Sequence, residues 1–441
     1  MNILGIDLGT TKNAVVIVDG NGTLLAVSAA PHKASYAVGT KGAEQNIAKT
    51  FSCLKMLIQQ LPPELLHDVA AIGITGQMHS VLVGTGETVS PLITWQDCRC
   101  GTERLQQFQT RSGLKLREGF GGATLARLAE ENILQNGAFV STISDWVVAL
   151  FTGILKPVTD PTHAASFGLY DFGSKNWNYA AIAALGIQKS LLPEIRPSGS
   201  IVGGLAANMA EKFGLPAGIP VVNAIGDNQA SILGCCSDSE KEIYLTIGTG
   251  MQLSVVAETS FDELPVGLEQ RPFTKDRNLI VSAPLCGGAA FAWLVDTINI
   301  FRCDFGEPKL SRDDLFVKLD LLALAAMKTG KVEITAKPYF LGERYCPSLR
   351  GAFDGLTLTN ATPGNIAAAL AIGIVHNLRH GFPEKLLSDK NIVIGSGNAV
   401  RKLKCIQKAI RREFGLPLQL SKTREEAASG VAKWAADAIK S

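Results

Sequence analysis

A short turn rich in glycine and threonine occurs twice in this 441-residue chain, each time between two apolar runs. The first copy covers residues 7–11 (DLGTT), and with Gly9 set against Gly248, 239 positions later, the second covers 246–250 (TIGTG). Two apolar runs joined by so short a turn predict a β-hairpin. Because internal duplication is a signal at the level of the whole fold, the chain should contain two related domains that each begin on such a hairpin.

The first copy also carries groups that suit a charged ligand. Gly9 lets the backbone adopt positive φ or approach a ligand closely, and the amides and hydroxyls of Thr10 and Thr11 can cradle an anion. Asp7 would bind a hard cation, because a buried unpaired carboxylate is poorly explained by packing. The alternative is a turn aspartate satisfied by nearby backbone amides. Since Asp7 aligns with Thr246, the pattern suits two phosphate-binding hairpins that share one metal-binding carboxylate.

Length and composition limit the class of protein. A chain of 441 residues is too long for one core, and the charged segment 237–242 divides it into domains 1–236 and 237–441. The net charge is +2 and there is no basic block, which argues against nucleic acid as a partner. We find neither a signal peptide nor an apolar run of about 18 residues, so we expect a cytoplasmic protein without a membrane partner. The nine cysteines lack zinc-like spacing and should be reduced thiols.

Three polar clusters follow expected strands in the first half. The strand at 69–75 leads into Gln77, Met78 and His79, and the strand at 219–225 leads into Asp227 and Asn228 at the start of a helix. Ligands of open α/β sheets bind at such carboxyl ends. The alternatives are a structural histidine at 79 and a simple helix N-cap at 227.

The third cluster, at 94–99, combines an indole, an amide, a carboxylate and a guanidinium in Trp95, Gln96, Asp97 and Arg99. Sugar sites use this mixture, with apolar faces against C–H groups and planar polar groups on hydroxyls. A solvated helix start with a core tryptophan is the alternative. We also expect helices at about 42–61 and over most of 102–155.

The second half contains further glycine turns that open helices, at 285–290 and at 395–399. The strand at 392–394 runs into Gly395 and Gly397, where bare backbone would accept a flat adenine. The last helix, 424–440, carries small residues at 427–430, and we expect these to pack on the 395–397 turn.

Taken together, these motifs resemble the FGGY family of carbohydrate kinases over essentially the whole chain. The most specific are residues 5–11, 226–229 and a second signature at 342–356. Segments 94–100, 119–125, 164–166 and 395–397 look most like the sedoheptulokinase subgroup. The resemblance implies an α/β fold of two ribonuclease H-like (actin-like ATPase) domains with an interdomain active-site cleft. It also implies ATP-dependent phosphorylation of the terminal hydroxyl of a ketose, sedoheptulose giving sedoheptulose 7-phosphate, as in the pentose phosphate pathway.

The resemblance also implies roles for individual residues. Asp227 would be the general base, and Asp7 would organise Mg²⁺ directly or through water. The implied sugar-binding residues are Gln77, Met78, His79, Trp95, Asp97, Arg99, Asp227 and Asn228. The implied ATP-binding residues are Thr10, Thr11, Lys12, Gly248, Thr249, Gly288, Gly395, Gly397 and Asn398.

Two other functions stay open from the sequence. The first is a kinase for another ketose or polyol, such as xylulose or ribulose, since the subgroup likeness rests on few pocket residues. The second is a sugar- or nucleotide-binding regulator without catalysis, against which the presence of both Asp7 and Asp227 argues. The partners implied for the kinase are a small-molecule ketose substrate and ATP, and the sequence leaves the oligomeric state open.

Overall fold

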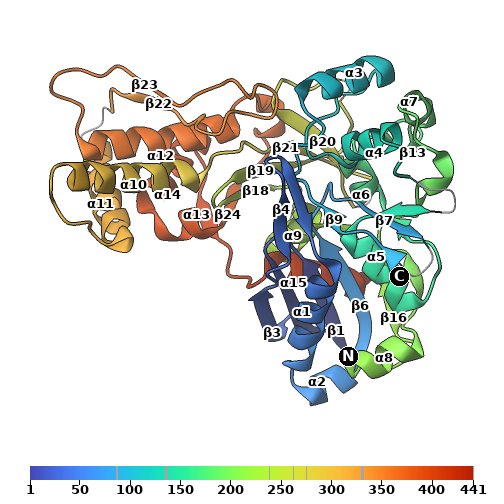
Figure 1. The fold of residues 1–441 in the computed structure, drawn as a ribbon. Helices are drawn as coiled ribbons and strands as arrows, with labels where there is room; N and C mark the ends of the chain where they lie inside the picture. Colours follow the sequence, from blue (N-terminus) through green and yellow to red (C-terminus); the bar gives the residue numbers. More distant parts are fainter. Residues whose placement is uncertain are drawn as a thin grey trace. The chain divides into compact units, whose positions relative to one another are not determined.

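The computed structural model describes residues 1–85, 88–134, 138–237, 239–261, 263–274, 276–328 and 332–440. The chain forms two compact units. Unit 1 comprises Met1–Cys235, Pro272–Lys275 and Thr423–Ser441, and unit 2 comprises Cys236–Arg271 and Asp276–Lys422. Each unit is built around a mixed β-sheet (Figure 1).

The sheet of unit 1 has the strand order β15-β16-β6-β1-β2-β3, with β17 also paired to β6. The first three strands in sequence are antiparallel neighbours, whereas β6 runs parallel to β1 and β16 runs parallel to β6. The strands are β1 (Asn2–Leu8), β2 (Lys12–Asp19), β3 (Leu24–Pro31), β6 (Val69–Gly76), β15 (Ile201–Gly204), β16 (Pro220–Val222) and β17 (Ile225–Gly226).

Both faces of this sheet are covered, which explains why β1 reads as an almost continuous apolar run. Leu4 and Ile6 face a core shared with the helices α1 (Ile47–Gln59), α5 (Ile143–Thr152) and α8 (Ala207–Phe213). Ile3, the residue before Leu4, points to the opposite face and packs with the small residues of α15 (Glu426–Ala438). The period of two along a strand therefore sorts neighbouring residues to opposite layers.

A second core in unit 1 lies among the helices α3 (Thr102–Ser112), α4 (Gly121–Glu130), α6 (Pro161–Ser166) and α7 (Tyr179–Ala184). Short strands accompany it: β4 (Ser35–Val38), β5 (Gly42–Gln45), β7 (Leu82–Thr85), β8 (Thr88–Val89), β9 (Leu92–Ile93), β10 (Phe139–Ser141), β11 (Val158–Thr159), β12 (Tyr170–Asp171), β13 (Asn176–Trp177) and β14 (Glu194–Ile195). The helix α2 (Pro63–His67) precedes β6.

The sheet of unit 2 repeats the arrangement, in the order β20-β21-β19-β18-β24-β25. The hairpin β18–β19 is antiparallel, β21 pairs with it on one side, and the parallel strand β24 lies on the other. The strands are β18 (Glu242–Ile247), β19 (Met251–Ala257), β20 (Leu268–Pro272), β21 (Asn278–Ser282), β24 (Ile392–Ser396) and β25 (Leu418–Leu420). The helices are α10 (Gly288–Asp304), α11 (Arg312–Lys328), α12 (Pro363–Arg379), α13 (Asn398–Lys402) and α14 (Lys404–Phe414), and a small pair β22 (Thr335–Lys337) and β23 (Ala352–Asp354) stands apart.

The two hairpins expected from the repeated turn are both confirmed. In the first, Leu8 pairs with Asn13, and in the second, Ile247 pairs with Met251. The first strand of each hairpin also pairs with a parallel strand, β1 with β6 and β18 with β24. The duplication therefore extends from the turn to the whole sheet.

The last helix differs from its expected place. The sequence predicts this helix in a second domain of residues 237–441, on the 395–397 turn, whereas α15 belongs to unit 1 and packs on α9 (Asp227–Cys235), β1 and β6. Glycine makes this possible, since a Cβ on Gly430 would lie 1.7 Å from the carbonyl oxygen of Ala230. A Cβ on Gly5 of β1 would lie 2.1 Å from the carbonyl oxygen of Ala428. The small residues at 427–430 thus serve contact with α9 and the sheet.

Some element boundaries also differ from expectation. The helix expected at about 42–61 starts only at Ile47, because the side chain of Asn46 caps it by accepting from the amide of Lys49. The strand expected at 219–225 is divided into β16 and β17, and between them Asn223 donates to the carbonyl of Thr159. The second signature, 342–356, begins in irregular structure after β22.

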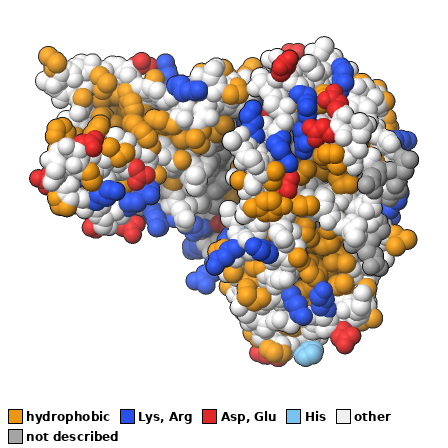
Figure 2. Space-filling view, in the orientation of Figure 1, with side chains coloured by type: hydrophobic (Ala, Val, Ile, Leu, Met, Phe, Trp, Pro, Cys, Tyr) orange, Lys and Arg blue, Asp and Glu red, His pale blue; other side chains and the backbone are white. Residues whose placement is uncertain are grey.

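Surface charge on the face drawn in Figure 2 is mixed, with basic and acidic side chains interspersed among apolar patches. Within the residues described, no helix has both the length and the apolar character needed to cross a bilayer.

Candidate functional site

Three strand ends of unit 1 bring Asp7 and Asp227 to the same edge of the sheet. Asp7 of β1 is in register with Thr75 of β6, and Thr75 is in register with Ile225 of β17. Asp227 follows two residues later as the first residue of α9. The two aspartates therefore lie at the carboxyl ends of parallel strands on either side of β6, at the sheet edge where α/β proteins bind ligands.

The charges around Asp7 show how close these groups lie. Burial, together with the charges of Asp227 and Glu425, raises the pKa of Asp7 to about 8, and the charge of Lys12 opposes this rise. Oδ1 of Asp7 is buried and has no hydrogen-bond partner among the described residues. This argues against a turn aspartate satisfied by backbone amides. A buried acceptor without a partner is costly, so this edge suits a bound cation or donor.

Glu425 was missed by the sequence analysis. Its carboxylate oxygens lie 2.7 and 2.6 Å from Nζ of Lys12, at the start of β2, although the two residues are 413 positions apart. The Glu425 backbone has a φ of 48°, in the left-handed region that non-glycine residues rarely adopt. The only sequence signal was an acidic residue at a helix start, which normally indicates a cap.

The turn at 9–11 is held by side chains from other segments of unit 1. Nε1 of Trp95 donates to the hydroxyl of Thr10 over 2.9 Å. The carbonyl of Thr10 faces Nε2 of His32 at 3.0 Å and accepts from Nε2 of Gln45 over 2.6 Å. Trp95, expected in the sugar pocket, therefore lies directly beside the turn expected to hold phosphate, while Thr11 and Lys12 remain exposed.

The segment before Asp227 is fixed on both sides. The hydroxyl of Thr75 donates to the carbonyl of Ile225 over 2.6 Å, and the amide of Gly226 donates to the hydroxyl of Thr162 over 2.8 Å. A Cβ on Gly226 would lie 2.8 Å from Sδ of Met78, so Met78 packs directly against this turn. Asn228, the next residue of α9, is buried. Asp227 therefore follows a backbone segment held by hydrogen bonds, and Met78, an expected sugar-binding residue, packs against that segment.

His79 and Gln77 both make internal contacts. His79 has a φ of 68°, its Nδ1 lies 2.6 Å from the carbonyl of Ser166, and its ring stacks on Phe120 at 4.7 Å. Because a carbonyl only accepts, Nδ1 carries the proton. Gln77 donates from Nε2 to Oε1 of Gln45 over 2.9 Å. His79 therefore has structural partners, and its role towards a sugar remains a prediction.

Asp97 and Arg99 bind mainly to each other and to β5. The Asp97 carboxylate accepts from the amide of Ala43 over 3.0 Å and from Nε of Arg99 over 2.7 Å. Nη2 of Arg99 donates to Glu44 over 2.7 Å. Because these bonds occupy most of both charged groups, they explain the motif structurally and leave its contact with sugar as a prediction.

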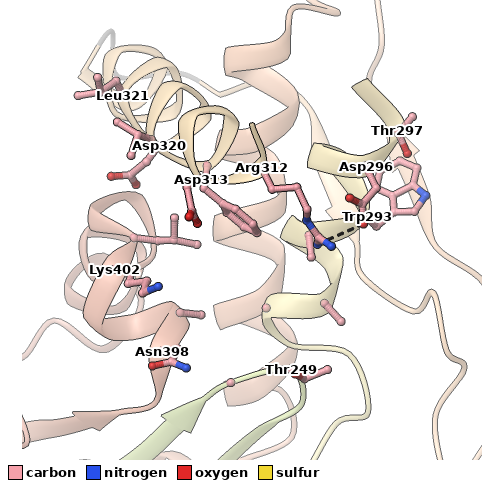
Figure 3. Close-up of a pocket in the computed structure, with 18 of the residues that line it drawn as sticks. Thr249, Trp293, Asp296, Thr297, Arg312, Asp313, Asp320, Leu321, Asn398 and Lys402 are labelled. Carbon is pink, nitrogen blue, oxygen red and sulfur yellow. Dashed lines mark ion pairs between the residues drawn. The ribbon is translucent and has the colours of Figure 1, made fainter. Parts of the chain in front are cut away.

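In unit 2 a cavity of about 1160 Å³ contains four of the expected ATP-binding residues (Figure 3). Gly248 and Thr249 come from the β18–β19 turn, Gly288 begins α10 and Asn398 begins α13. Their convergence follows from the duplicated topology, since the hairpin turn and the end of β24 lie at one edge of the sheet. A cavity of this size accommodates a nucleoside phosphate.

Other lining residues were missed because they come from the helices α10 and α11. Figure 3 shows Asn398 and Lys402 on one wall, opposite Trp293 and the ion pair of Arg312 with Asp296, 3.3 Å apart. No short motif indicates the lining residues of α10 and α11, since each is a single polar or aromatic residue on a long helix.

Gly395 and Gly397 do not line this cavity among the residues described. A Cβ on Gly397, whose φ is 87°, would lie 2.5 Å from the carbonyl oxygen of Ile247. A Cβ on Gly395 would lie 2.8 Å from Leu418. Their lack of side chains lets β24 pack against its neighbours and so places Asn398 at the cavity.

Glu343 of the second signature holds the loop that leads into α10, whose first residue lines the cavity. Glu343 is buried, and its carboxylate accepts from the amide of Leu285 over 3.3 Å and from Asn377 over 3.1 Å. Burial raises the pKa of Glu343, while the bond from Asn377 opposes the rise. Glu343 thereby anchors the glycine turn that precedes Gly288.

Comparison with known proteins agrees with this geometry. Residues 2–234 match the N-terminal domain of the FGGY family of carbohydrate kinases. The chain belongs to the FGGY family of carbohydrate kinases. It is 30% identical to human (Homo sapiens) sedoheptulokinase over 97% of this chain and 96% of that protein. It is 27% identical to glycerol kinase from Trichlorobacter lovleyi over 83% of this chain and 75% of that protein.

Solved FGGY structures confirm the fold. Xylulose kinase from Rhodospirillum rubrum superposes with a TM-score of 0.84 at 22% identity, covering 99% of this chain and 90% of that one. Gluconate kinase from Lactobacillus acidophilus gives a TM-score of 0.83 at 22% identity, covering 100% and 89%. The predicted α/β class with two ribonuclease H-like (actin-like ATPase) domains is therefore correct, and the chain is a carbohydrate kinase.

Proposed function

We propose that this FGGY kinase transfers the γ-phosphoryl group of ATP to the terminal hydroxyl of a ketose, with sedoheptulose as the preferred acceptor and sedoheptulose 7-phosphate as the product. The observation that carries the proposal is the approach of Asp7 and Asp227 at one edge of the unit 1 sheet. The choice of sugar is supported by the full-length similarity to human and mouse sedoheptulokinases.

In this proposal Asp227 is the general base. Its carboxylate accepts the proton of the attacking hydroxyl, and the bonds of Thr75 and Thr162 to the preceding backbone hold it in place. A positioned base contributes about 10²- to 10⁴-fold to the rate. Phosphoryl transfer otherwise depends on positioning and on neutralising charge, so the side chains expected around the sugar act mainly by orienting it.

The residues near Asp7 fit a magnesium ion. Its buried Oδ1 lacks a partner, and the surrounding charges of Asp227 and Glu425 favour a cation. In the part of the chain that is described, no group of three or more His, Cys, Asp or Glu residues is arranged to hold a metal. Proteins commonly bind Mg²⁺ through one or two carboxylates plus substrate phosphates, and in this proposal Asp7 supplies such a carboxylate. When bound, the ion would neutralise phosphate charge, and Asp7 would hold it directly or through water.

Each unit carries residues that suit a part of the nucleotide. Thr10, Thr11, Lys12 and Thr249 would donate to phosphate oxygens, since hairpin amides, hydroxyls and an ammonium group suit anions. The cavity of unit 2 would hold the nucleoside, with Gly248, Gly288 and Asn398 in its wall and Gly395 and Gly397 shaping the turn behind.

A panel of four- to seven-carbon sugars and polyols with ATP and Mg²⁺, monitored for ADP release, tests the proposal. We expect sedoheptulose to give the highest kcat/KM, and removal of Mg²⁺ by a chelator to abolish turnover. A higher value for xylulose, ribulose or glycerol would replace the substrate but keep the reaction. ADP release that no sugar raises above the sugar-free rate would contradict the proposal, and sugar binding without turnover would indicate a regulator.

A further inference from the structure

Two buried glutamine side chains link the turn at 9–11 to the end of β6. Gln45 is fully buried on β5, and Gln77, only 1% exposed, directly follows β6. We propose that Gln45 fixes the Gln77 amide so that its oxygen accepts a hydrogen bond from a hydroxyl of the substrate. The inference rests on the proposed function, but it names Gln45, which no motif indicated, as a positioning residue for sugar recognition.

The order of donors and acceptors starts at the carbonyl of Thr10, which can only accept. Gln45 must therefore direct its amide nitrogen to Thr10, and the distance is 2.6 Å. His32 supports the same carbonyl: its Nδ1 accepts from the amide of Ala34 over 3.0 Å, so its Nε2 carries the proton and donates to Thr10. The hydroxyl of Ser35 also donates to this carbonyl, over 3.4 Å, so all three of its side-chain neighbours are donors.

The orientation of Gln45 in turn determines which atom of the Gln77 amide donates. With its nitrogen on Thr10, Gln45 presents Oε1, and Nε2 of Gln77 donates to it over 2.9 Å. If Gln45 were flipped, its oxygen would face the Thr10 oxygen and its NH₂ would face the NH₂ of Gln77. Two repulsive contacts would replace two hydrogen bonds in a buried site, so the orientation is fixed.

The hydrogen bonds from Thr10 through Gln45 to Gln77, called the relay below, leave one oxygen of Gln77 to accept from a ligand. Oε1 of Gln77 is buried and has no partner among the described residues. Gln77 follows Gly76, which is in register with Gly226 directly before Asp227, so both residues come directly after paired strand ends. A fixed acceptor here selects a ligand that brings a donor, and a sugar hydroxyl supplies one. A substrate without that hydroxyl leaves the acceptor unpaired.

The relay can be tested by replacing Gln45 with glutamate, whose side chain can be titrated, and measuring how sugar binding changes with pH. In Gln45→Glu, a protonated carboxyl would donate to Thr10 and accept from Gln77, as glutamine does, whereas the ionised form has no donor. Burial should raise the pKa of the introduced group. Binding of sedoheptulose without ATP is measured by calorimetry from about pH 5.5 to about pH 8.5. The ratio of Kd values, variant to wild type at each pH, cancels titrations common to both proteins, including those of nearby His32, Tyr36, Glu44, Asp97, Arg99 and Asp7.

We expect the Kd ratio of Gln45→Glu to be near one at low pH and to rise about tenfold at high pH. Gln45→Ala should weaken binding about tenfold at every pH. The matched control is Gln407→Ala in unit 2, which also removes a bond from a buried amide to a backbone carbonyl, over 2.8 Å to Val400, and should leave the Kd unchanged.

The outcomes separate the inference from the function on which it rests. If wild type binds sedoheptulose and both Gln45 variants bind it equally well at all pH values, the relay is wrong and the kinase proposal stands. An equal, pH-independent loss in Gln45→Glu and Gln45→Ala would assign Gln45 to folding alone and would also overturn the inference. If wild type binds neither sedoheptulose nor xylulose, the sugar site and the relay both fail.

Discussion

Beneath Asp227 lies a group of buried ionisable residues that no motif indicated. Asp160 accepts from the hydroxyl of Thr162, which itself accepts from the amide of Gly226. Asp145 accepts from Thr159 over 2.7 Å, and its other oxygen is buried without a partner in the described chain. Burial raises the pKa of Asp145 to about 8 and that of Asp160 to about 6. The rigid turn before the proposed base therefore depends on carboxyls held away from water.

This burial predicts how stability changes with pH. The folded pKa of Asp145, about 8, is raised above its ordinary value of 3.8, so its contribution is full below about pH 4 and is lost as the pH rises towards 8. Asp145→Asn cannot ionise. We expect the free energy of unfolding of the variant, minus that of wild type, to increase by at least about 1 kcal/mol between about pH 5 and about pH 8. Denaturant unfolding at both pH values measures it, and a constant difference would contradict the assignment.

At single residues, the sequence predicted those whose signal is local. Asp7 and Asp227 could be found because each directly follows or ends an apolar strand. Gln45 and Glu425 could not, because each acts through a partner brought close only by the tertiary fold. Asp97 and Arg99 were identified as a polar cluster, but not as partners of each other and of β5.

Among the elements, α15 shows how glycine decides a packing interface. It contacts α9 and covers β1 and β6 at very short separation. A Cβ on Gly234 of α9 would lie 2.1 Å from the carbonyl of Glu426, and one on Gly73 of β6 would lie 2.3 Å from that of Val431. Because the nearest atoms belong to the backbone, a change of side-chain rotamer cannot remove the clash that a larger residue would make.

We therefore expect Gly430→Ala to reduce the free energy of unfolding by about 2 to 3 kcal/mol through overpacking, despite the better helix propensity of alanine. The matched control is Gly20→Ala, where the nearest atom to an added Cβ, on Met1, lies 3.7 Å away and stability should hardly change. Thermal and denaturant unfolding of both variants provide the measurement. Equal stability of Gly430→Ala and wild type would contradict the packing.

The elements that the sequence predicted best are those in the duplicated hairpins. Shifting β2 by the same 239 positions gives 251–258, and β19 is Met251–Ala257. The last helix was misplaced because its small residues predict close packing but do not identify the partner. The helix α1 was extended too far because β5, at Gly42–Gln45, is too short for strand periodicity to be distinguished from a helical pattern.

For the whole molecule, two similar units carry different chemistry. Unit 1 contains the acidic edge and unit 2 the large cavity, although both begin on the same hairpin and share a sheet topology. The family match at residues 2–234 covers the half that holds Asp7 and Asp227. In the two turns Asp7 stands against Thr246, so only the hairpin of unit 1 carries a carboxylate at this position.

The most direct test replaces the proposed base while keeping its shape. With sedoheptulose, ATP and Mg²⁺, Asp227→Asn should lower kcat at least about a hundredfold and leave the sugar Kd within about threefold of wild type. Asp19→Asn, at an exposed turn aspartate that accepts from the amides of Asn21 and Thr23, should retain full turnover as the control. Near-normal kcat in Asp227→Asn would remove this carboxylate from the reaction and contradict the account.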